Sequence, residues 1–422
     1  MKQYNEYKDS GVKWIGEMPE HWKLTRIKFL FNEISEKEHP EGPCLCSTQK
    51  YGVIPQSMYE NRVVVVNKGL ENLKFVRKGN FVISLRSFQG GIEIAHYQGI
   101  ISAAYTILSL GSKNISSNYI KYLFKSSPFI QLLQICVTGI REGQNINYEL
   151  LRRQFIPIPT LSEQNEIVAY LDNKVSKIDK YISTAEKKMA ALEELKQVTI
   201  ADAVTHGINP NVPMKDSGIP WIGMVPEHWE VKRAAIMFSE NKNKNSKYEF
   251  SHAFKFNYGT LVPKDETGDV SEYRDTYEAY TIIKKNDIAI NCLNLNYDFV
   301  SQRVAISPNR GILTSAYLII TPRNGVNPYY YNYLFKAMDS KKLFHGMGTG
   351  IRLTLSYTEL KKQFLPNPSF TEQDEIVAYI DRKVAQIDKM KVLELAQIDK
   401  LKEYKQRLIS DVVTGKVKVT NE

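Results

Sequence analysis

The chain has 422 residues, too many for one compact hydrophobic core, so we expect two or more domains. Its 56 lysine and arginine residues exceed its 46 aspartate and glutamate residues, which gives a formal charge of +10 and favours a polyanionic partner. The sequence shows neither a secretory signal peptide nor an apolar run of membrane-spanning length, so we expect a cytoplasmic protein with no membrane partner.

The first recognisable segment, residues 9–22, reads DSGVKWIGEMPEHW and returns at 216–229 as DSGIPWIGMVPEHW. All four tryptophans of the chain lie in these two copies. Such a turn-rich segment indicates aromatic anchors at the start of a domain. Its histidines, His21 and His228, have no neighbouring nucleophile or carboxylate cluster in the sequence, so we interpret them as structural.

The segments that follow also occur in pairs and in the same order. Glycine turns precede apolar strands, and a short tyrosine-rich helix comes after them. The matching ranges are 51–52 with 258–259, 76–88 with 282–295, 99–108 with 311–320, 119–127 with 330–338, and 138–155 with 349–364. This unbroken order indicates a duplicated unit of about 209 residues, each copy a mixed α+β domain.

Each copy ends in a long run without glycine or proline, which opens with LSEQNEIVAY at 161 or FTEQDEIVAY at 370. Ser162 and Thr371 stand where a helix N-cap is expected, with acidic residues just inside the helix. Apolar residues then recur at steps of three and four, the spacing of a coiled-coil seam. The residues that we expect to serve helix pairing and partner docking are Ile167, Leu171, Val175, Ile178, Ile182, Ile376, Ile380, Val384 and Ile387.

The seam continues through Ala185, Met189 and Leu192 in the first helix, whereas Lys391 and Glu394 interrupt it in the second. Two ordinary amphipathic core helices would show a similar spacing, but two long, matched helices in one chain favour packing against each other. We therefore predict an α+β fold in which two duplicated mixed α/β domains are separated by two long helices that form a coiled coil. The expected boundaries are 1–160 and 206–369 for the domains, 161–205 and 370–415 for the helices, and 416–422 for a tail.

The two copies differ most in their polar loops. Residues 84–91 read SLRSFQGG where 291–298 read NCLNLNYD, and the basic stretch NKNKNSK at 241–247 has no counterpart. Arg, Lys, Asn, Gln and Ser are the side chains that address base edges and phosphates, although solvated loops also vary freely. The residues that we select as DNA-contacting, with the lysines on phosphates, are Arg86, Ser87, Gln89, Arg141, Gln144, Asn145, Lys242, Lys244, Asn291, Asn294, Asn296, Arg352 and Thr354.

No catalytic site and no metal site is evident in the sequence. The phosphate-loop, zinc-protease, nucleophile-elbow and glycine-rich cofactor motifs are all missing. Residues 367–370, NPSF, resemble the Asn-Pro-Pro-Tyr/Phe motif of DNA amino-methyltransferases but lack its middle proline, so we reject that assignment. Cys44 and Cys46 supply only half of a metal site, so we expect buried, reduced thiols.

Four motifs that each occur twice, W-I-G-x-x-P-x-H-W, T-G-I-R, Q-F-x-P-x-P and E-Q-x-E-I-V-A-Y, together resemble the specificity subunit of Type I restriction-modification systems. The resemblance covers essentially the whole chain. It implies a non-catalytic subunit with two target-recognition domains, each reading one half of a bipartite double-stranded DNA site. It also implies that the two long helices pack antiparallel with pseudo-twofold symmetry and set the spacer between the half-sites.

The resemblance further implies partners and the place of the cofactors. Two modification subunits that dock at the helices would bind S-adenosylmethionine and methylate adenine, and restriction subunits would supply an ATP- and Mg²⁺-dependent motor and nuclease. The chain itself would hold no cofactor. From the residues alone two alternatives stay open: a coiled-coil scaffold that binds only proteins, and a self-contained DNA methyltransferase, which the missing catalytic motif disfavours.

Overall fold

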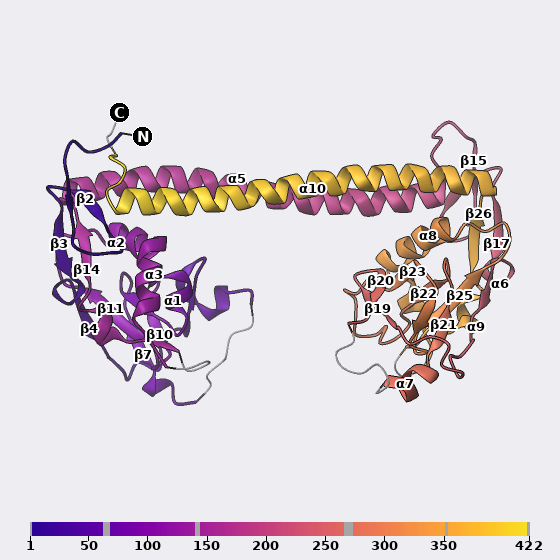
Figure 1. Ribbon diagram of the computed structural model, residues 1–422, viewed down its shortest axis with the longest axis horizontal. Coiled ribbons are helices and arrows are strands. Elements are labelled where there is room, and N and C mark those ends of the chain that lie inside the picture. The colour runs from indigo at the N-terminus through magenta and orange to yellow at the C-terminus, as the bar shows by residue number, and fades with distance from the viewer. Residues whose placement is uncertain (1, 62–67, 140–143, 266–272, 351–352, 420–422) are drawn as a thin grey trace. The chain divides into compact units, whose positions relative to one another are not determined.

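The computed structural model describes residues 2–61, 68–139, 144–265, 273–350 and 353–419 (Figure 1). The chain divides into two compact units: unit 1 is Met1–Ala185 with Leu395–Glu422, and unit 2 is Glu186–Glu394. Both long helices, α5 (Leu161–His206) and α10 (Phe370–Val413), cross this division. Each unit therefore holds one globular domain, the beginning of one long helix and the end of the other.

The long helices begin slightly earlier than the sequence predicted. Their N-caps are Thr160 and Ser369, whose hydroxyls accept the backbone N–H three residues further on, at 3.4 Å and 3.3 Å. The prediction that Ser162 and Thr371 are the caps is wrong, because both residues already lie inside the first helical turn.

The two helices run antiparallel, as the ion pairs inside unit 2 show. Going up α5 and down α10, the contacts join Lys188 to Glu394, Glu193 to Lys391 at 2.5 Å, and Lys196 to Asp388 at 2.9 Å. The two charged residues that interrupt the apolar seam of α10 thus face opposite charges on α5. In unit 1 Lys405 of α10 donates to Asp179 of α5 at 2.6 Å. Such exposed pairs contribute about 0–1 kcal/mol each, so they fix the pairing more than they stabilise it.

The apolar seam is buried within each unit. Ile167 and Leu171 have no exposed surface, Ile178 and Ile182 are also buried, and Val175 is half-buried. In unit 2 the corresponding buried residues are Ile376, Ile380 and Ile387, with Val384 half-buried. Ile376 and Ile380 share one core cluster with Val204 of α5 and Trp229 of the domain. These side chains hold helix to helix and helix to domain, so a partner subunit has to contact other, exposed residues.

The domain of unit 1 is built on a four-stranded antiparallel sheet in the order β4-β11-β8-β9, with strand pairs beside it. Its strands are β1 (Tyr7–Asp9), β2 (Glu17–Pro19), β3 (Lys23–Arg26), β4 (Phe31–Ile34), β5 (Leu45–Thr48), β6 (Gly52–Pro55), β7 (Lys74–Val76), β8 (Phe81–Ile83), β9 (Glu93–Ile94), β10 (Gly99–Ile101), β11 (Thr106–Leu110), β12 (Val137–Thr138), β13 (Asn145–Ile146) and β14 (Phe155–Ile158). Its helices are α1 (Ser87–Gly90), α2 (Ser117–Phe124), α3 (Ser127–Ile135) and α4 (Tyr148–Leu151), with 3-10 turns η1 (Ile27–Phe29), η2 (Gln56–Met58) and η3 (Leu70–Asn72).

The domain of unit 2 repeats this sheet in the order β18-β25-β22-β23. Its strands are β15 (Met214–Asp216), β16 (Met224–Pro226), β17 (Glu230–Arg233), β18 (Phe238–Glu240), β19 (Phe254–Asn257), β20 (Thr260–Pro263), β21 (Thr281–Ile283), β22 (Ile288–Ile290), β23 (Val304–Ile306), β24 (Gly311–Leu313), β25 (Leu318–Pro322) and β26 (Phe364–Asn367). Its helices are α6 (Ala234–Met237), α7 (Arg274–Glu278), α8 (Pro328–Ser340) and α9 (Tyr357–Leu360), with the 3-10 turn η6 (Leu343–Gly346).

The glutamine of each E-Q motif joins the start of a long helix to its own domain. Gln164 is fully buried, accepts the N–H of Ser116 at 2.8 Å and donates to the carbonyl of Pro159 at 3.0 Å. Gln373 makes the same two bonds in unit 2, accepting from Asn327 at 2.8 Å. Because Ser116 and Asn327 cap α2 and α8, the glutamine fixes the angle between the long helix and the domain.

A buried tyrosine joins the end of the other long helix to the same domain. The hydroxyl of Tyr119 on α2 donates to the carbonyl of Val413 at 3.2 Å, and that of Tyr330 on α8 donates to Val204 at 2.8 Å. Carbonyls in the last turn of a helix lack intrahelical partners, so these bonds satisfy groups that burial would otherwise leave unpaired. Within each unit, hydrogen bonds thus connect the domain to the beginning of one long helix and to the end of the other.

The tryptophan segments anchor the domains as predicted. Trp22 and Trp229 have no exposed surface. The adjacent histidines, His21 and His228, do have carboxylate neighbours that the sequence did not reveal: each contacts the glutamate in the first turn of a long helix at 3.0 Å. These contacts join domain to helix, which supports the structural interpretation of both histidines.

All four cysteines are free. Cys46, Cys136 and Cys292 are buried, and burial raises the pKa of each thiol, that of Cys292 to about 12. Protonated thiols are poor nucleophiles and poor metal ligands. Among the described residues, no three side chains of the metal-binding types gather at one point.

Candidate nucleic-acid interface

The two sheets fix which residues of the two domains are equivalent. In unit 1 Phe81 of β8 pairs with Ile94 of β9, and in unit 2 the equivalent Ile288 of β22 pairs with Ile306 of β23. The chain between the paired residues is 82–93 in unit 1 and 289–305 in unit 2, so this connector is five residues longer in unit 2. Equivalent strands therefore carry unlike loops at the position where the sequence copies diverge.

In unit 1 the connector forms the short helix α1. Arg86, which directly precedes it, and Gln89 within it are exposed. Ser87 is buried, and its hydroxyl accepts the backbone N–H of Ser84 at 2.9 Å. The selection of Ser87 as a DNA-contacting residue is wrong, because its side chain completes the turn before α1 instead of reaching the surface.

The hairpin β12–β13 lies beside α1 and carries Gln144 and Asn145, both exposed. The structure thus places these two residues on an element that neighbours the one bearing Arg86 and Gln89. Arg141, the arginine of the T-G-I-R turn, lies outside the described residues. Four of the six residues selected in unit 1 are therefore surface side chains on adjoining elements.

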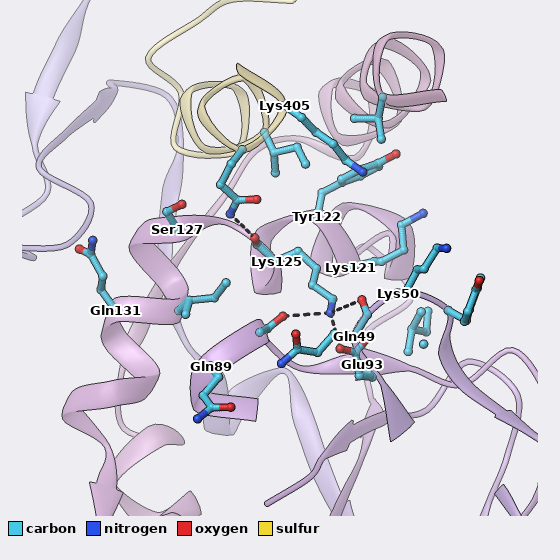
Figure 2. A pocket seen from close by; sticks show the side chains of 18 of the residues that line it. Gln49, Lys50, Gln89, Glu93, Lys121, Tyr122, Lys125, Ser127, Gln131 and Lys405 are labelled. Carbon is cyan, nitrogen blue, oxygen red and sulfur yellow. Dashed lines mark hydrogen bonds and ion pairs between the residues drawn. The ribbon is translucent and has the colours of Figure 1, made fainter. Parts of the chain in front are cut away.

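A groove of about 880 Å³ borders α1 and joins Gln89 to lysines that the sequence analysis did not select (Figure 2). Lys50 reaches it from the β5–β6 turn, Lys121 from α2 and Lys405 from α10. Lysines beside amide side chains in a concave surface suit a polyanionic backbone with accessible bases. Nearby carboxylates moderate this charge, since Lys405 bonds to Asp179 and Lys121 lies 3.8 Å from Asp172.

Lys125 holds the floor of this groove together. Its ammonium group contacts the Glu93 carboxylate and donates to the carbonyl oxygens of Gly90 at 2.9 Å and Gln49 at 3.3 Å. Burial raises the pKa of the Glu93 carboxyl, and the adjacent Lys125 opposes that rise. The ammonium group of Lys125 thus bonds to groups of the protein, and it positions the residues around α1.

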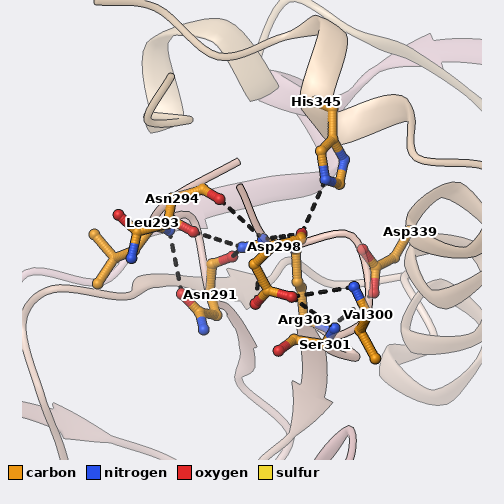
Figure 3. A network of polar contacts seen from close by, with 9 residues as sticks. All are labelled: Asn291, Leu293, Asn294, Asp298, Val300, Ser301, Arg303, Asp339 and His345. Carbon is orange, nitrogen blue, oxygen red and sulfur yellow. Dashed lines mark hydrogen bonds and ion pairs between the residues drawn. The ribbon is translucent and has the colours of Figure 1, made fainter. Parts of the chain in front are cut away.

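In unit 2 the part of the connector between β22 and β23, residues 291–303, contains the three selected asparagines (Figure 3). Asn294 is exposed, with a left-handed backbone conformation of φ 54°. Asn291 is half-buried, and its side-chain carbonyl accepts the N–H of Leu293 at 3.1 Å. Asn296 is also half-buried. Asn294 is therefore the most accessible of the three, and it has exposed apolar neighbours, Tyr297 and Val300, that the sequence analysis did not select.

The other residues selected in unit 2 differ in their exposure and in their contacts. Thr354 is exposed, and its backbone N–H donates to Thr349 at 3.0 Å, while Arg352 lies outside the described residues. Lys242 pairs with Glu240 at 2.9 Å. Lys244 donates to the carbonyl of Ala279 at 3.2 Å and contacts the Ser315 hydroxyl. Both lysines are exposed and have partners within unit 2, as Lys405 has in unit 1.

In the described part of the chain, no helix combines the length and apolar character needed to cross a bilayer. Comparison with known proteins then identifies relatives along the whole length. Residues 19–194 match the family model of the Type I restriction modification DNA specificity domain. The Type I restriction enzyme MjaVIII specificity subunit of Methanocaldococcus jannaschii is 22% identical over 439 residues, covering 98% of each chain. The Type I restriction enzyme EcoBI specificity subunit of Escherichia coli is 20% identical over 58% of this chain and 54% of its own.

Two solved structures share the fold. One, from work on complex assembly and conformational transition of the type I R-M system, superposes with a TM-score of 0.66 at 15% identity and covers 95% of this chain and 99% of its own. The HsdS subunit from Thermoanaerobacter tengcongensis superposes with a TM-score of 0.51 at 14% identity, covering 95% and 98%. These comparisons confirm the resemblance predicted from the duplicated motifs, and the two superpositions confirm the predicted fold class.

Proposed function

We propose that this chain is a specificity subunit of a Type I restriction-modification system and that it reads a bipartite double-stranded DNA site, one half-sequence with each unit. One observation carries the proposal: two equivalent sheets hold connectors of different length and chemistry. A protein that binds one partner twice would keep both surfaces alike. A protein that reads two different sequences keeps the scaffold and changes the loops.

The chemistry of each connector suits a different set of bases. Arginine pairs bidentately with guanine, and glutamine or asparagine with adenine, so Arg86 and Gln89 offer unit 1 a mixed readout. Asn294 offers unit 2 an adenine contact. Lys50, Lys121 and Lys405 of the groove bind phosphates, which position the duplex without specifying its sequence.

The paired helices set the distance between the half-sites and carry the modification subunits. Support for docking comes from α10, where Val392 and Leu393 are 66% and 61% exposed, although large apolar side chains favour burial. In this scheme two modification subunits bind S-adenosylmethionine, and restriction subunits bind ATP and Mg²⁺. The assembled complex works on DNA in the cytoplasm, and the chain contributes sequence choice without a cofactor of its own.

The test is the salt dependence of duplex binding by the chain assembled with its modification subunits. The plot of log K against log salt has a negative slope, and removing one lysine that pairs with a phosphate should reduce the magnitude of that slope by about 1. Replacing Lys50, Lys121 and Lys405 together by alanine should therefore reduce it by about 3. Lys402→Ala serves as the matched control, because Lys402 is exposed on the same helix as Lys405 but does not line the groove. A complex that binds proteins alone would show no salt-dependent retention of DNA, and that result would refute the proposal.

A further inference from the structure

The connector of unit 2 buries the side chains of Cys292 and Leu295, turns several backbone carbonyls inward and exposes the side chains of Asn294, Tyr297 and Val300. Asp298, Ser301 and neighbouring residues close tight turns, because the Asp298 carboxylate accepts the N–H of Val300 at 3.1 Å and of Ser301 at 2.9 Å. Meanwhile Tyr297 is 78% exposed and Val300 is 92% exposed. Ordering a loop costs conformational entropy, and exposing large apolar side chains to water is unfavourable. Other contacts must therefore stabilise the conformation of this loop.

The cause lies beneath the loop, in the fully buried side chain of Arg303 (Figure 3). Its guanidinium donates to four loop carbonyls: Asn291 at 3.1 Å, Leu293 at 2.7 Å, Asn294 at 3.4 Å and Asp298 at 2.6 Å. Its charge is balanced by the Asp298 carboxylate at 3.5 Å. The planar fork of an arginine can collect several carbonyls in fixed directions, which the single ammonium group of a lysine cannot.

Further contacts hold Arg303 itself and the far side of the loop. The backbone N–H of Arg303 donates to the buried Asp339 carboxylate of α8 at 2.8 Å. His345 donates through Nε2 to the carbonyl of Asp298 at 3.2 Å, and its ring stacks on Phe299 at 4.6 Å. The arginine is therefore fixed to the scaffold of unit 2 and in turn fixes the loop.

The described residues of unit 1 show no counterpart to this arrangement. By the sheet register, the position equivalent to Arg303 is Gly91. Gly91 has a φ of 89°, and a Cβ placed on it would lie 2.3 Å from the carbonyl oxygen of Phe124. No side chain fits there, so the short connector of unit 1 is ordered by α1 and Lys125 instead. The arginine belongs to the longer loop alone.

We propose that Arg303 is the positioning residue of unit 2: it holds residues 291–302 as a preformed loop whose Asn294, Tyr297 and Val300 select A·T pairs in one half-sequence. The inference rests on the proposed function and adds the residues and the base chemistry. An asparagine amide matches adenine, and apolar side chains contact the thymine methyl group, so this exposed set fits A·T pairs better than G·C pairs. A loop ordered before binding avoids the entropy cost of ordering it on the DNA.

The experiment compares variants of the chain assembled with its modification subunits on duplexes that carry single base-pair changes in either half-sequence. Arg303→Lys keeps the charge but loses the fork, and Arg303→Met removes both. Arg310→Met is the matched control, because Arg310 is an exposed arginine of the same unit, 3.7 Å from Glu249. Hydrogen exchange of residues 291–302 and thermal unfolding are measured for every variant.

Arg303→Lys should speed exchange in the loop and reduce discrimination at the A·T pairs of one half-sequence by at least about fivefold, leaving the other half-sequence and the Arg310 control unchanged. Asn294→Ala, a substitution at the surface, should abolish discrimination at one A·T pair and leave the melting temperature and the hydrogen exchange unchanged. This variant still tests the inference if Arg303→Met fails to fold. Undiminished discrimination in both Arg303→Lys and Asn294→Ala would overturn the inference. A wild-type complex that ignores changes in either half-sequence would refute the proposed function itself, a result distinguishable from the first.

Discussion

Lengthening both long helices by the same amount should lengthen the DNA between the half-sequences and change nothing else. The insertions belong between Ala185 and Glu186 in α5 and between Glu394 and Leu395 in α10, where the division between the units crosses the helices. Every helix-to-helix ion pair described above then stays within its own unit. Neither domain is altered.

Four residues in each helix add about 6 Å and leave a rotation of about 40° beyond the insertion, so the apolar seam can re-form. Because one base pair rises about 3.4 Å, the spacer should grow by one or two base pairs. The same insertion in α5 alone should give a smaller gain, since the unmodified α10 resists it. Two residues in each helix turn the seam by about 200°, which exposes its isoleucines and should destroy the protein.

The assay is the modified-base motif read by sequencing DNA from cells that carry each variant. The four-residue variant should show both half-sequences unchanged and one or two additional unspecified base pairs between them. An active four-residue variant that keeps the original spacer, or that alters a half-sequence, would refute the reasoning, because the helices would then not determine the spacing.

Three further substitutions or titrations test separate parts of the account. Arg86→Ala should cost about 1–3 kcal/mol of binding at one half-sequence only, measured on duplexes with single changes; unchanged affinity and an unchanged motif would remove Arg86 from the interface. Ile376→Asp should lower stability by more than about 4 kcal/mol, because Ile376 is fully buried, whereas Val392→Asp at an exposed site of α10 should change it by less than about 0.5 kcal/mol; similar melting of the two would contradict the packing. Hydrogen bonds from Ser301 and Val300 lower the pKa of Asp298 to about 2, so its contribution to loop order is complete above the unfolded value of about 3.9 and is lost as the pH falls through 2. Amide protection of Val300 and Ser301 should follow that curve, and Asp298→Asn should show weak protection with no such pH dependence; a wild-type loop already unprotected at pH 5 would speak against it.

The long helices were predictable because their determinants are local. The apolar spacing that begins at Ile167 and Ile376 specifies a buried face from sequence alone, and both faces are buried. Cap positions were less certain, since Thr160 and Ser162 both suit an N-cap and only the backbone geometry decides between them. Charges on the seam of α10 were also recognisable, but their partners lie about 200 residues away on α5.

The connectors that differ between the two domains could be located from sequence divergence, but their conformations could not. The inward position of Ser87 depends on its bond to Ser84, and the longer loop depends on four carbonyls that converge on Arg303. Lys405 joins Gln89 at the groove although more than 300 residues separate them in the chain. Contacts between residues so far apart in the sequence form only in the assembled fold, and no local sequence pattern predicts them.

The most direct test of the central claim is the modified-base motif made by a chain that carries the unit 1 domain twice, with residues 1–160 in place of 207–369 and both long helices retained. If each unit reads one half-sequence, the motif of this variant should contain the first half-sequence twice and lose the second. A motif in which the original second half-sequence persists would contradict the account, because recognition of that half would then not reside in unit 2.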